Sequence, residues 1–179
     1  MRALPAIRDF WFGREHAAPM AAFRISLGLI VFLDTALTLL PHAARWFGAE
    51  GFHSPGETQW WLEQPGRWGF FTGRTDVNTL RLGLCALMLL SWCMIAGLAT
   101  RLSAACAFVL LMSFHHLNPN MLNAGDALLR IGLLYLALMP SWRALSLDRR
   151  IAARFGWKAA SDAPVWSLRL AQIQLCIMY

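Results

Sequence analysis

Several side chains that could do chemistry lie close together in residues 115–131, which read HHLNPNMLNAGDALLRI between two apolar runs. A histidine that faces a cavity can act as an acid, a base or a hydrogen-bond donor near neutral pH. Charged groups placed within a membrane are costly and usually serve a function. We therefore predict that the catalytic residues are His115, His116, Asp126 and Arg130.

The spacing of the two histidines argues against a metal site. Neighbouring side chains on a helix point about 100° apart, so His115 and His116 cannot both bind one ion. The sequence also has no H-x-x-x-H or H-E-x-x-H pattern, so we expect no metal. An interfacial or structural role for these histidines remains open beside the catalytic one.

Asp126 and Arg130 are four residues apart, so on a helix they share a face and can form an ion pair. Because Asp126 follows the tripeptide NAG, we also predict that it caps the start of that helix. A cap with an ion pair is one interpretation, and lining a site is the other. The tripeptide NPN at 118–120 is typical of a turn. We expect Asn118 and Asn123 either to shape this hinge or to line a polar cavity.

Polar residues also occur inside the first long apolar run. Arg24, Gly28, Asp34, Thr35 and Thr38 fall within an arc of about 120° on a helix. A charge near the centre of a membrane costs about 2.5–3.5 kcal/mol, so these groups should face the helix bundle rather than lipid. We predict that Arg24 and Asp34 line a polar cavity. A structural ion pair, or snorkelling of Arg24 to the membrane surface, is the alternative.

The last apolar run carries a polar stripe of its own. Arg169, Gln172, Cys176 and Tyr179 recur at a spacing of three or four residues, along one face of a helix. We expect this stripe to meet the other polar faces inside the bundle, where Arg169 and Gln172 would line the cavity.

The composition indicates a membrane protein. The 179 residues are 58% hydrophobic and 15% charged, with a mean hydropathy of +0.46, whereas soluble domains average about 45–50% and about 25%. The formal net charge is +6. Nearly all the basic residues are arginines near the ends of apolar runs, which argues against nucleic acid and favours the lipid bilayer as partner. Four cysteines within apolar runs are interpreted as packing residues: Cys85, Cys93, Cys106 and Cys176.

Helices long enough to cross a membrane must position these side chains. A bilayer core about 30 Å thick needs roughly 20 helical residues. The candidate runs are Ala21–Leu40, Leu80–Ala99, Leu102–Leu117, Asp126–Met139 and Val165–Tyr179. We expect a tight turn at Thr100-Arg101 and a break within the fifth run, because a spanning helix should not end with unsatisfied carbonyls in lipid. The predicted fold is all-α: a polytopic transmembrane helical bundle with about four complete spans plus an incomplete fifth.

Residues 1–17 precede the first run and mix aromatic residues with arginines. This pattern is typical of a short helix that lies in the membrane interface. The loops on the N-terminal side of the predicted bundle hold most of the basic loop residues. We therefore expect an integral, multi-pass membrane protein whose N-terminus is cytoplasmic.

Three blocks of the chain resemble a known family: AAFRISLGLIVFLD, HHLNPNMLNAGDALLRIGLLYLALMPSWRALSLDRR and WSLRLAQIQLCIMY. Their order and spacing resemble the HTTM (horizontally transferred transmembrane) domain, which is related to vitamin K-dependent gamma-carboxylase. The resemblance implies that residues 18–179 are the N-terminal part of such a domain in a bacterial plasma membrane. It also implies a site region that contains His115, His116, Asn118, Asn123, Asp126 and Arg130.

The carboxylases of this family are membrane enzymes that oxidise reduced vitamin K and carboxylate glutamate side chains. The resemblance implies a carboxylase-like module that acts on a secreted peptide or protein with a reduced, vitamin K-like quinone. One departure is that the family's essential lysine lies beyond the helix that matches Leu168–Tyr179, and the only lysine here, Lys158, does not match it. The alternative is a non-enzymatic membrane partner in peptide-toxin maturation or immunity.

Overall fold

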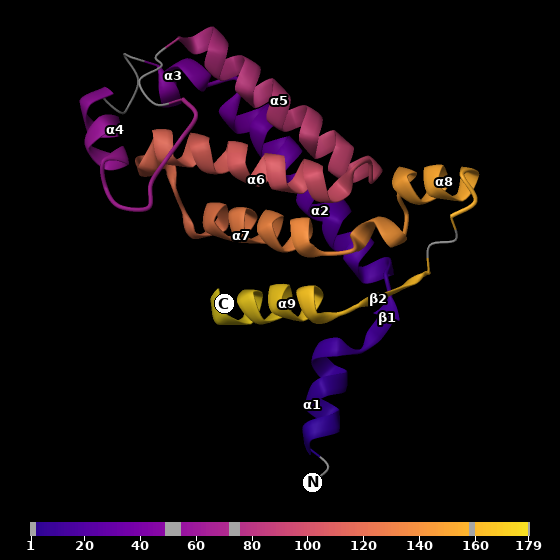
Figure 1. The fold of residues 1–179 in the computed structure, drawn as a ribbon. Helices are drawn as coiled ribbons and strands as arrows, with labels where there is room; N and C mark the ends of the chain where they lie inside the picture. The colour runs from indigo at the N-terminus through magenta and orange to yellow at the C-terminus, as the bar shows by residue number, and fades with distance from the viewer. Residues whose placement is uncertain (1–2, 49–54, 72–75, 158–159, 179) are drawn as a thin grey trace.

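The computed structural model describes residues 3–48, 55–71, 76–157 and 160–178. The predictions for Lys158 and Tyr179 fall outside these residues. Within them the chain is helical apart from one two-stranded ribbon (Figure 1). In chain order the elements are α1 (Ala3–Phe12), β1 (Arg14–His16), α2 (Ala18–Asp34), the π-helix η1 (Thr35–Leu39), α3 (Ala43–Phe47), α4 (Pro55–Leu62), α5 (Val77–Ala96), α6 (Thr100–Leu117), the 3-10 turn η2 (Pro119–Met121), α7 (Ala124–Leu138), the 3-10 turn η3 (Ser141–Arg143), α8 (Leu147–Arg154), β2 (Asp162–Pro164) and α9 (Trp166–Met178).

Three of the described segments are long and apolar enough to cross a membrane: Ala18–Leu39, Val77–Ala96 and Thr100–Leu117. They coincide with the first three predicted runs, which confirms the all-α prediction and its membrane-type helices. α7 has 15 residues and α9 has 13. At about 1.5 Å per residue these helices are about 22 Å and about 20 Å long, less than the ~30 Å hydrocarbon core. The structure therefore does not confirm four complete spans plus a fifth.

The long helices pack around an apolar core. α2 packs against α5, α5 against α6 and α6 against α7 (Figure 1). At Gly28 the backbones of α2 and α5 approach closely, because a β-carbon there would lie 3.0 Å from Ile95 Cγ1 and 3.3 Å from the Ser91 carbonyl oxygen. Each of the four helices contributes buried side chains to this core, among them Leu27, Leu87, Leu111 and Leu133.

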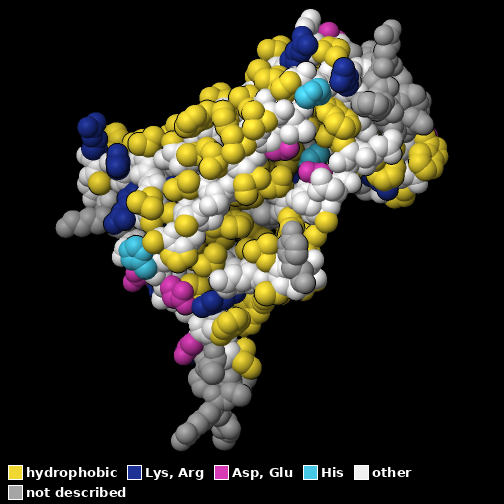
Figure 2. Space-filling view, turned by 180° about the vertical axis from the view of Figure 1, so that it is seen from behind, with side chains coloured by type: hydrophobic (Ala, Val, Ile, Leu, Met, Phe, Trp, Pro, Cys, Tyr) yellow, Lys and Arg dark blue, Asp and Glu magenta, His cyan; other side chains and the backbone are white. Residues whose placement is uncertain are grey.

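Hydrophobic side chains also cover much of the surface. Figure 2 shows them spread over the back of the bundle, with basic side chains at both ends, including the end that carries α8. The side chains of Leu82 and Leu89 on α5 and Leu102 on α6 are 71%, 65% and 66% exposed. An apolar surface of this extent is rare in a water-soluble monomer and suits contact with a lipid bilayer. Three cysteines are exposed: Cys85, Cys106 and Cys176. The interpretation of the cysteines as packing residues is therefore wrong for these three within the described chain.

The turn between α5 and α6 lies earlier than the predicted Thr100-Arg101. Gly97 ends α5 with φ of 73° and Ala99 follows with φ of 44°, so Thr100 already belongs to α6. A residue of α8 fixes the position of this turn. The Asp148 carboxylate accepts hydrogen bonds from the backbone N–H groups of Ala99 (2.9 Å) and Thr100 (3.3 Å). A distant carboxylate thus caps the start of α6.

A short antiparallel ribbon joins segments from near the two ends of the chain. β1 pairs with β2 in a register that places Arg14 opposite Pro164. The ribbon returns α9 to the side of α7, whereas α1 extends away from the bundle (Figure 1). α1 is the helix predicted within residues 1–17.

The start of α5 makes one pH dependence testable. The Asp76 carboxylate accepts hydrogen bonds from the Thr79 hydroxyl (2.7 Å) and from the backbone N–H groups of Thr79 (3.0 Å) and Asn78 (3.3 Å). These bonds, the Thr79 hydroxyl first, lower the pKa of Asp76 below its ordinary value of 3.8. Because the folded pKa is the lower one, the stabilisation is full above the unfolded pKa and is lost as pH falls through the folded pKa.

We expect acidification from about pH 5 to about pH 2 to lower the thermal unfolding midpoint of the wild type more than that of Asp76→Asn, whose amide does not titrate in this range. All other carboxyl groups are common to both proteins, so the difference between the two curves isolates Asp76. Parallel curves would show that this cap does not contribute to acid sensitivity.

Candidate functional site

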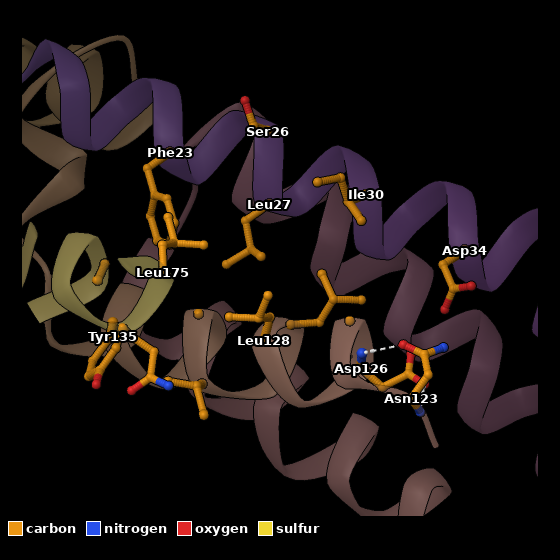
Figure 3. Close-up of a pocket in the computed structure, with 16 residues that line it drawn as sticks. Phe23, Ser26, Leu27, Ile30, Asp34, Asn123, Asp126, Leu128, Tyr135 and Leu175 are labelled. Atoms are coloured by element: carbon orange, nitrogen blue, oxygen red, sulfur yellow. Dashed lines mark hydrogen bonds between the residues drawn. The ribbon is translucent and has the colours of Figure 1, made fainter. Parts of the chain in front are cut away.

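A pocket of about 410 Å³ lies between α2, α7 and α9. The three helices meet there because the β1–β2 ribbon returns α9 to the bundle. Most of the wall is apolar, with Phe23 and Ile30 from α2, Leu128 from α7 and Leu175 from α9 (Figure 3). Pockets that bind small molecules typically measure about 300–1,000 Å³ and are lined mainly by apolar groups, as this one is.

Polar side chains gather at one end of this pocket. Asp34 projects from the end of α2 toward Asn123 and Asp126 at the start of α7 (Figure 3). The Asp126 N–H donates to Asn123 Oδ1 at 3.1 Å, and the Asn123 N–H donates to Asp126 Oδ2 at 2.9 Å. This reciprocal arrangement is a capping box in which the N-cap is Asn123. The prediction that Asp126 is the N-cap is therefore wrong, because the asparagine three residues earlier takes that position.

Two carboxylates share this polar end. Asp34 and Asp126 lie close enough to interact electrostatically. Asp34 ends α2, and the helix continues as the π-helix Thr35–Leu39. Such wider helical turns often occur beside functional sites. Asp34, Asn123 and Asp126 are thus the predicted site residues that the pocket brings together.

His116 and Asn118 hold a loop instead of lining the pocket. His116 Nδ1 lies 2.7 Å from the Trp68 carbonyl oxygen, so the tautomer protonated at Nδ1 donates a hydrogen bond to it. Asn118 Nδ2 donates to the Trp46 carbonyl oxygen at 2.8 Å. Both contacts fasten the segment between α2 and α5 to the end of α6. These contacts support a structural role for His116 and Asn118, which is one of the two interpretations of each residue.

Arg130 lies on a different face of α7 from the pocket. It makes no hydrogen bond or ion pair within the described residues, so the predicted pair with Asp126 is not formed there. The Asp126 carboxylate is instead engaged in the capping box with Asn123. Arg130 lies near enough to His115 to act on it electrostatically. His115 is only 1% exposed, and its Nδ1 has no hydrogen-bond partner in the described part of the chain.

Arg24 does not line the pocket either. It is fully buried, and its guanidinium donates to the carbonyl oxygens of Ser141 (2.9 Å), Ala144 (3.3 Å) and Leu145. These carbonyls belong to the turn between α7 and α8. We call the cluster of Arg24, the Gly97–Ala99 turn, the Ser141–Ser146 segment and Asp148 the arginine junction. Its contacts make Arg24 a structural residue that holds α2 to this turn.

Arg169 and Gln172 face away from the pocket. Arg169 Nη2 lies 2.8 Å from Glu15 Oε1 on β1, and Arg169 Nη1 donates to Gln172 Oε1 at 3.1 Å. The predicted inward stripe is therefore turned outward, because the β1–β2 ribbon supplies a carboxylate there. The polar residue that α9 contributes to the pocket is Gln174.

The sequence reasoning also missed Ser26 and Tyr135, which line the pocket. A usable pattern exists for each residue. Ser26 lies eight residues before Asp34, and Tyr135 lies seven after Leu128, so each pair shares one helical face. A search for residues on the face of Asp34 would have found Ser26.

Comparisons with known proteins add no assignment. The chain matches no protein-family model, no curated protein and no solved structure. The resemblance to the HTTM domain therefore remains a prediction from the residues quoted for it.

Proposed function

We propose that this chain is an HTTM-like membrane module that binds a reduced, vitamin K-like quinone in the pocket between α2, α7 and α9. The observation that carries the proposal is an apolar pocket of about 410 Å³ whose carboxylates are confined to one end. A quinol has the same division, with hydroxyl groups on its ring and an apolar tail. The ring would lie near Asp34 and Asp126, and the tail would run toward Phe23 and Leu175.

The position of the pocket suits a ligand that arrives from lipid. Ile30 of α2 and Leu175 of α9 line it, and they are 50% and 45% exposed on the apolar surface. We therefore propose that a hydrophobic ligand enters the pocket from the lipid phase between α2 and α9. The polar end holds hydrogen-bond acceptors for ring hydroxyls, and a few well-placed polar groups in an apolar pocket fix the orientation of a ligand.

The chemistry that we propose is carboxylase-like, with a secreted peptide or protein as the second substrate. Among the predicted catalytic residues Asp126 lines the pocket, and its carboxylate can accept a proton or hydrogen bond from a ring hydroxyl. His115 on α6 and Arg130 on the face of α7 away from the pocket stay proposed catalytic residues. Because His115 is 1% exposed, the helices around it would have to separate for a peptide to reach it. Asp34 is added to the proposed site as the second acceptor.

Equilibrium binding tests the ligand assignment. The full chain in detergent micelles is titrated anaerobically with a short-tailed vitamin K-type quinol by isothermal titration calorimetry. Asp34→Asn is expected to weaken binding by about tenfold to a hundredfold, because a hydrogen bond to a charged acceptor contributes about 1.5–3 kcal/mol. Asp9→Asn makes the same chemical change on exposed α1 and is the matched control.

Equal affinities of the wild type and Asp34→Asn would contradict the pocket assignment. If the wild type binds no quinol but captures a candidate peptide substrate, the carboxylase-like proposal fails and the non-enzymatic partner in peptide maturation or immunity is favoured.

A further inference from the structure

α8 is an amphipathic helix whose apolar side is only partly covered by the rest of the described chain. Leu147, Ile151 and Phe155 follow one another at four-residue intervals and so form one stripe. Their side chains are 39%, 44% and 79% exposed. The helix stands at one end of the bundle, beyond the ends of α5, α6 and α7 (Figure 1). None of the three side chains belongs to a buried core cluster, so their exposed surface is available to another apolar phase.

The end of α8 adds an aromatic side chain at the same place. Gly156 adopts φ of 79°, its N–H donates to the Ala153 carbonyl at 3.1 Å, and the Trp157 N–H donates to the Ala152 carbonyl at 2.9 Å. These two bonds are a Schellman motif, which reverses the chain in a fixed geometry. Trp157 is held there with 76% of its surface exposed. Tryptophan is enriched at the level of lipid headgroups.

Basic side chains flank the stripe, and they form no ion pair with an acidic side chain among the described residues. Arg150 and Arg154 are exposed and make no hydrogen bond or ion pair among the described residues. The acidic residue of α8, Asp148, is occupied by the N–H groups that it caps at the start of α6. The guanidinium groups of Arg150 and Arg154 therefore have no carboxylate partner in the described part of the chain.

We propose that α8 and Trp157 lie in the headgroup layer of the membrane and bind anionic phospholipid. The apolar stripe would enter the acyl boundary, and Arg150 and Arg154 would contact the phosphate groups. Helices of this composition bind at interfaces through buried apolar area together with attraction to anionic lipids. Guanidinium groups suit phosphate because their N–H donors match its oxygens in pairs. The inference does not depend on the ligand of the α2–α7–α9 pocket.

Lipid retention on the intact protein tests the charge component. The full chain in neutral detergent is titrated with phosphatidylglycerol or phosphatidylcholine, and native mass spectrometry reports the bound lipid. Neutralising both arginines in Arg150→Gln/Arg154→Gln is expected to weaken phosphatidylglycerol binding by about thirtyfold, since each basic residue near an anionic surface contributes about 1 kcal/mol. Phosphatidylcholine binding should stay unchanged.

The matched control is Arg45→Gln/Arg81→Gln, which removes the same charge from two exposed arginines outside α8. It should change phosphatidylglycerol binding by less than about twofold. An equal loss in both double variants would overturn the proposal and show non-specific attraction to a basic protein. Failure of the wild type to prefer phosphatidylglycerol over phosphatidylcholine would overturn it as well.

Hydrogen–deuterium exchange tests the apolar component. In bilayer discs of phosphatidylcholine with phosphatidylglycerol, residues 147–157 should exchange more slowly than in phosphatidylcholine alone. Ile151→Ser/Phe155→Ser keeps every arginine and should abolish that slowing. Both side chains are exposed, so the thermal midpoint in detergent should stay at the wild-type value and show that the fold is intact. Unchanged exchange in the wild type would contradict binding at α8.

Discussion

Arg24→Met is expected to lower the free energy of unfolding by about 3–5 kcal/mol. The fully buried guanidinium of Arg24 donates to the carbonyl oxygens of Ser141, Ala144 and Leu145. Methionine fills a similar volume but donates nothing, so three acceptors of one turn lose a charged donor. Leu145 has φ of 47°, and loss of the arginine removes a contact that holds it there.

The same substitution should make membrane insertion of the first span easier. A charge at the centre of a spanning helix costs about 2.5–3.5 kcal/mol to insert. Arg24 lies nearer the start of the Ala18–Leu39 span, so methionine removes a smaller cost there. We expect insertion efficiency to stay equal or rise in a glycosylation-mapping assay while the thermal midpoint in detergent falls. Opposite movement of the two readouts separates a folding defect from an insertion defect.

Arg169→Met is the control for Arg24→Met. Arg169 pairs with Glu15 at 2.8 Å, but the two side chains are 24% and 52% exposed. Such a pair contributes about 1 kcal/mol or less. If Arg169→Met lowered the free energy of unfolding as much as Arg24→Met, the arginine junction would contribute no more to stability than an exposed ion pair.

Gly97→Ala should destabilise the protein by about 3 kcal/mol. Gly97 has φ of 73°, and a β-carbon there would lie 2.4 Å from Ser146 Cβ, 2.7 Å from Ser146 Cα and 3.0 Å from Arg24 Nη1. The alanine therefore meets both an unfavourable backbone conformation and two neighbouring segments. Its methyl group would push the α5–α6 turn away from the α7–α8 turn.

Gly156→Ala supplies the comparison for Gly97→Ala. Gly156 has φ of 79°, but nothing lies within 4 Å of its added β-carbon. The expected destabilisation is therefore only the cost of the left-handed backbone conformation for alanine, about 1–2 kcal/mol. Thermal unfolding of both variants measures the difference, which is the cost of crowding at the arginine junction. Equal losses would mean that the turns separate freely to accept the methyl group.

Hydropathy was enough to predict α2, α5 and α6, because each needs only a continuous apolar run of membrane length. The hinge was predicted at the right place for a similar reason, since NPN and NAG are local turn and cap patterns. Three members of the candidate pocket, Asp34, Asn123 and Asp126, also followed from the sequence. Each lies at the end of an apolar helix, where the period of the helix fixes its face.

The partners of Arg24 could not be predicted, because they are backbone carbonyls of a turn more than a hundred residues away. No side-chain pattern marks such an acceptor. The orientation of Arg169 could not be predicted for a similar reason. Its spacing with Gln172 predicts one shared face of a helix, as observed. The direction of that face depends on Glu15 in a three-residue strand. Strands that short leave little trace in a sequence.

The β1–β2 ribbon has a consequence for the order of assembly. It brings together Arg14 and Asp162, which are separated by 148 positions. During synthesis β1 leaves the ribosome long before β2 exists, so α9 joins the bundle after the other long helices. Until then the face of α2 that carries Asp34 has no third wall. The pocket therefore closes last, when the ribbon forms and α9 completes the wall that α2 and α7 begin.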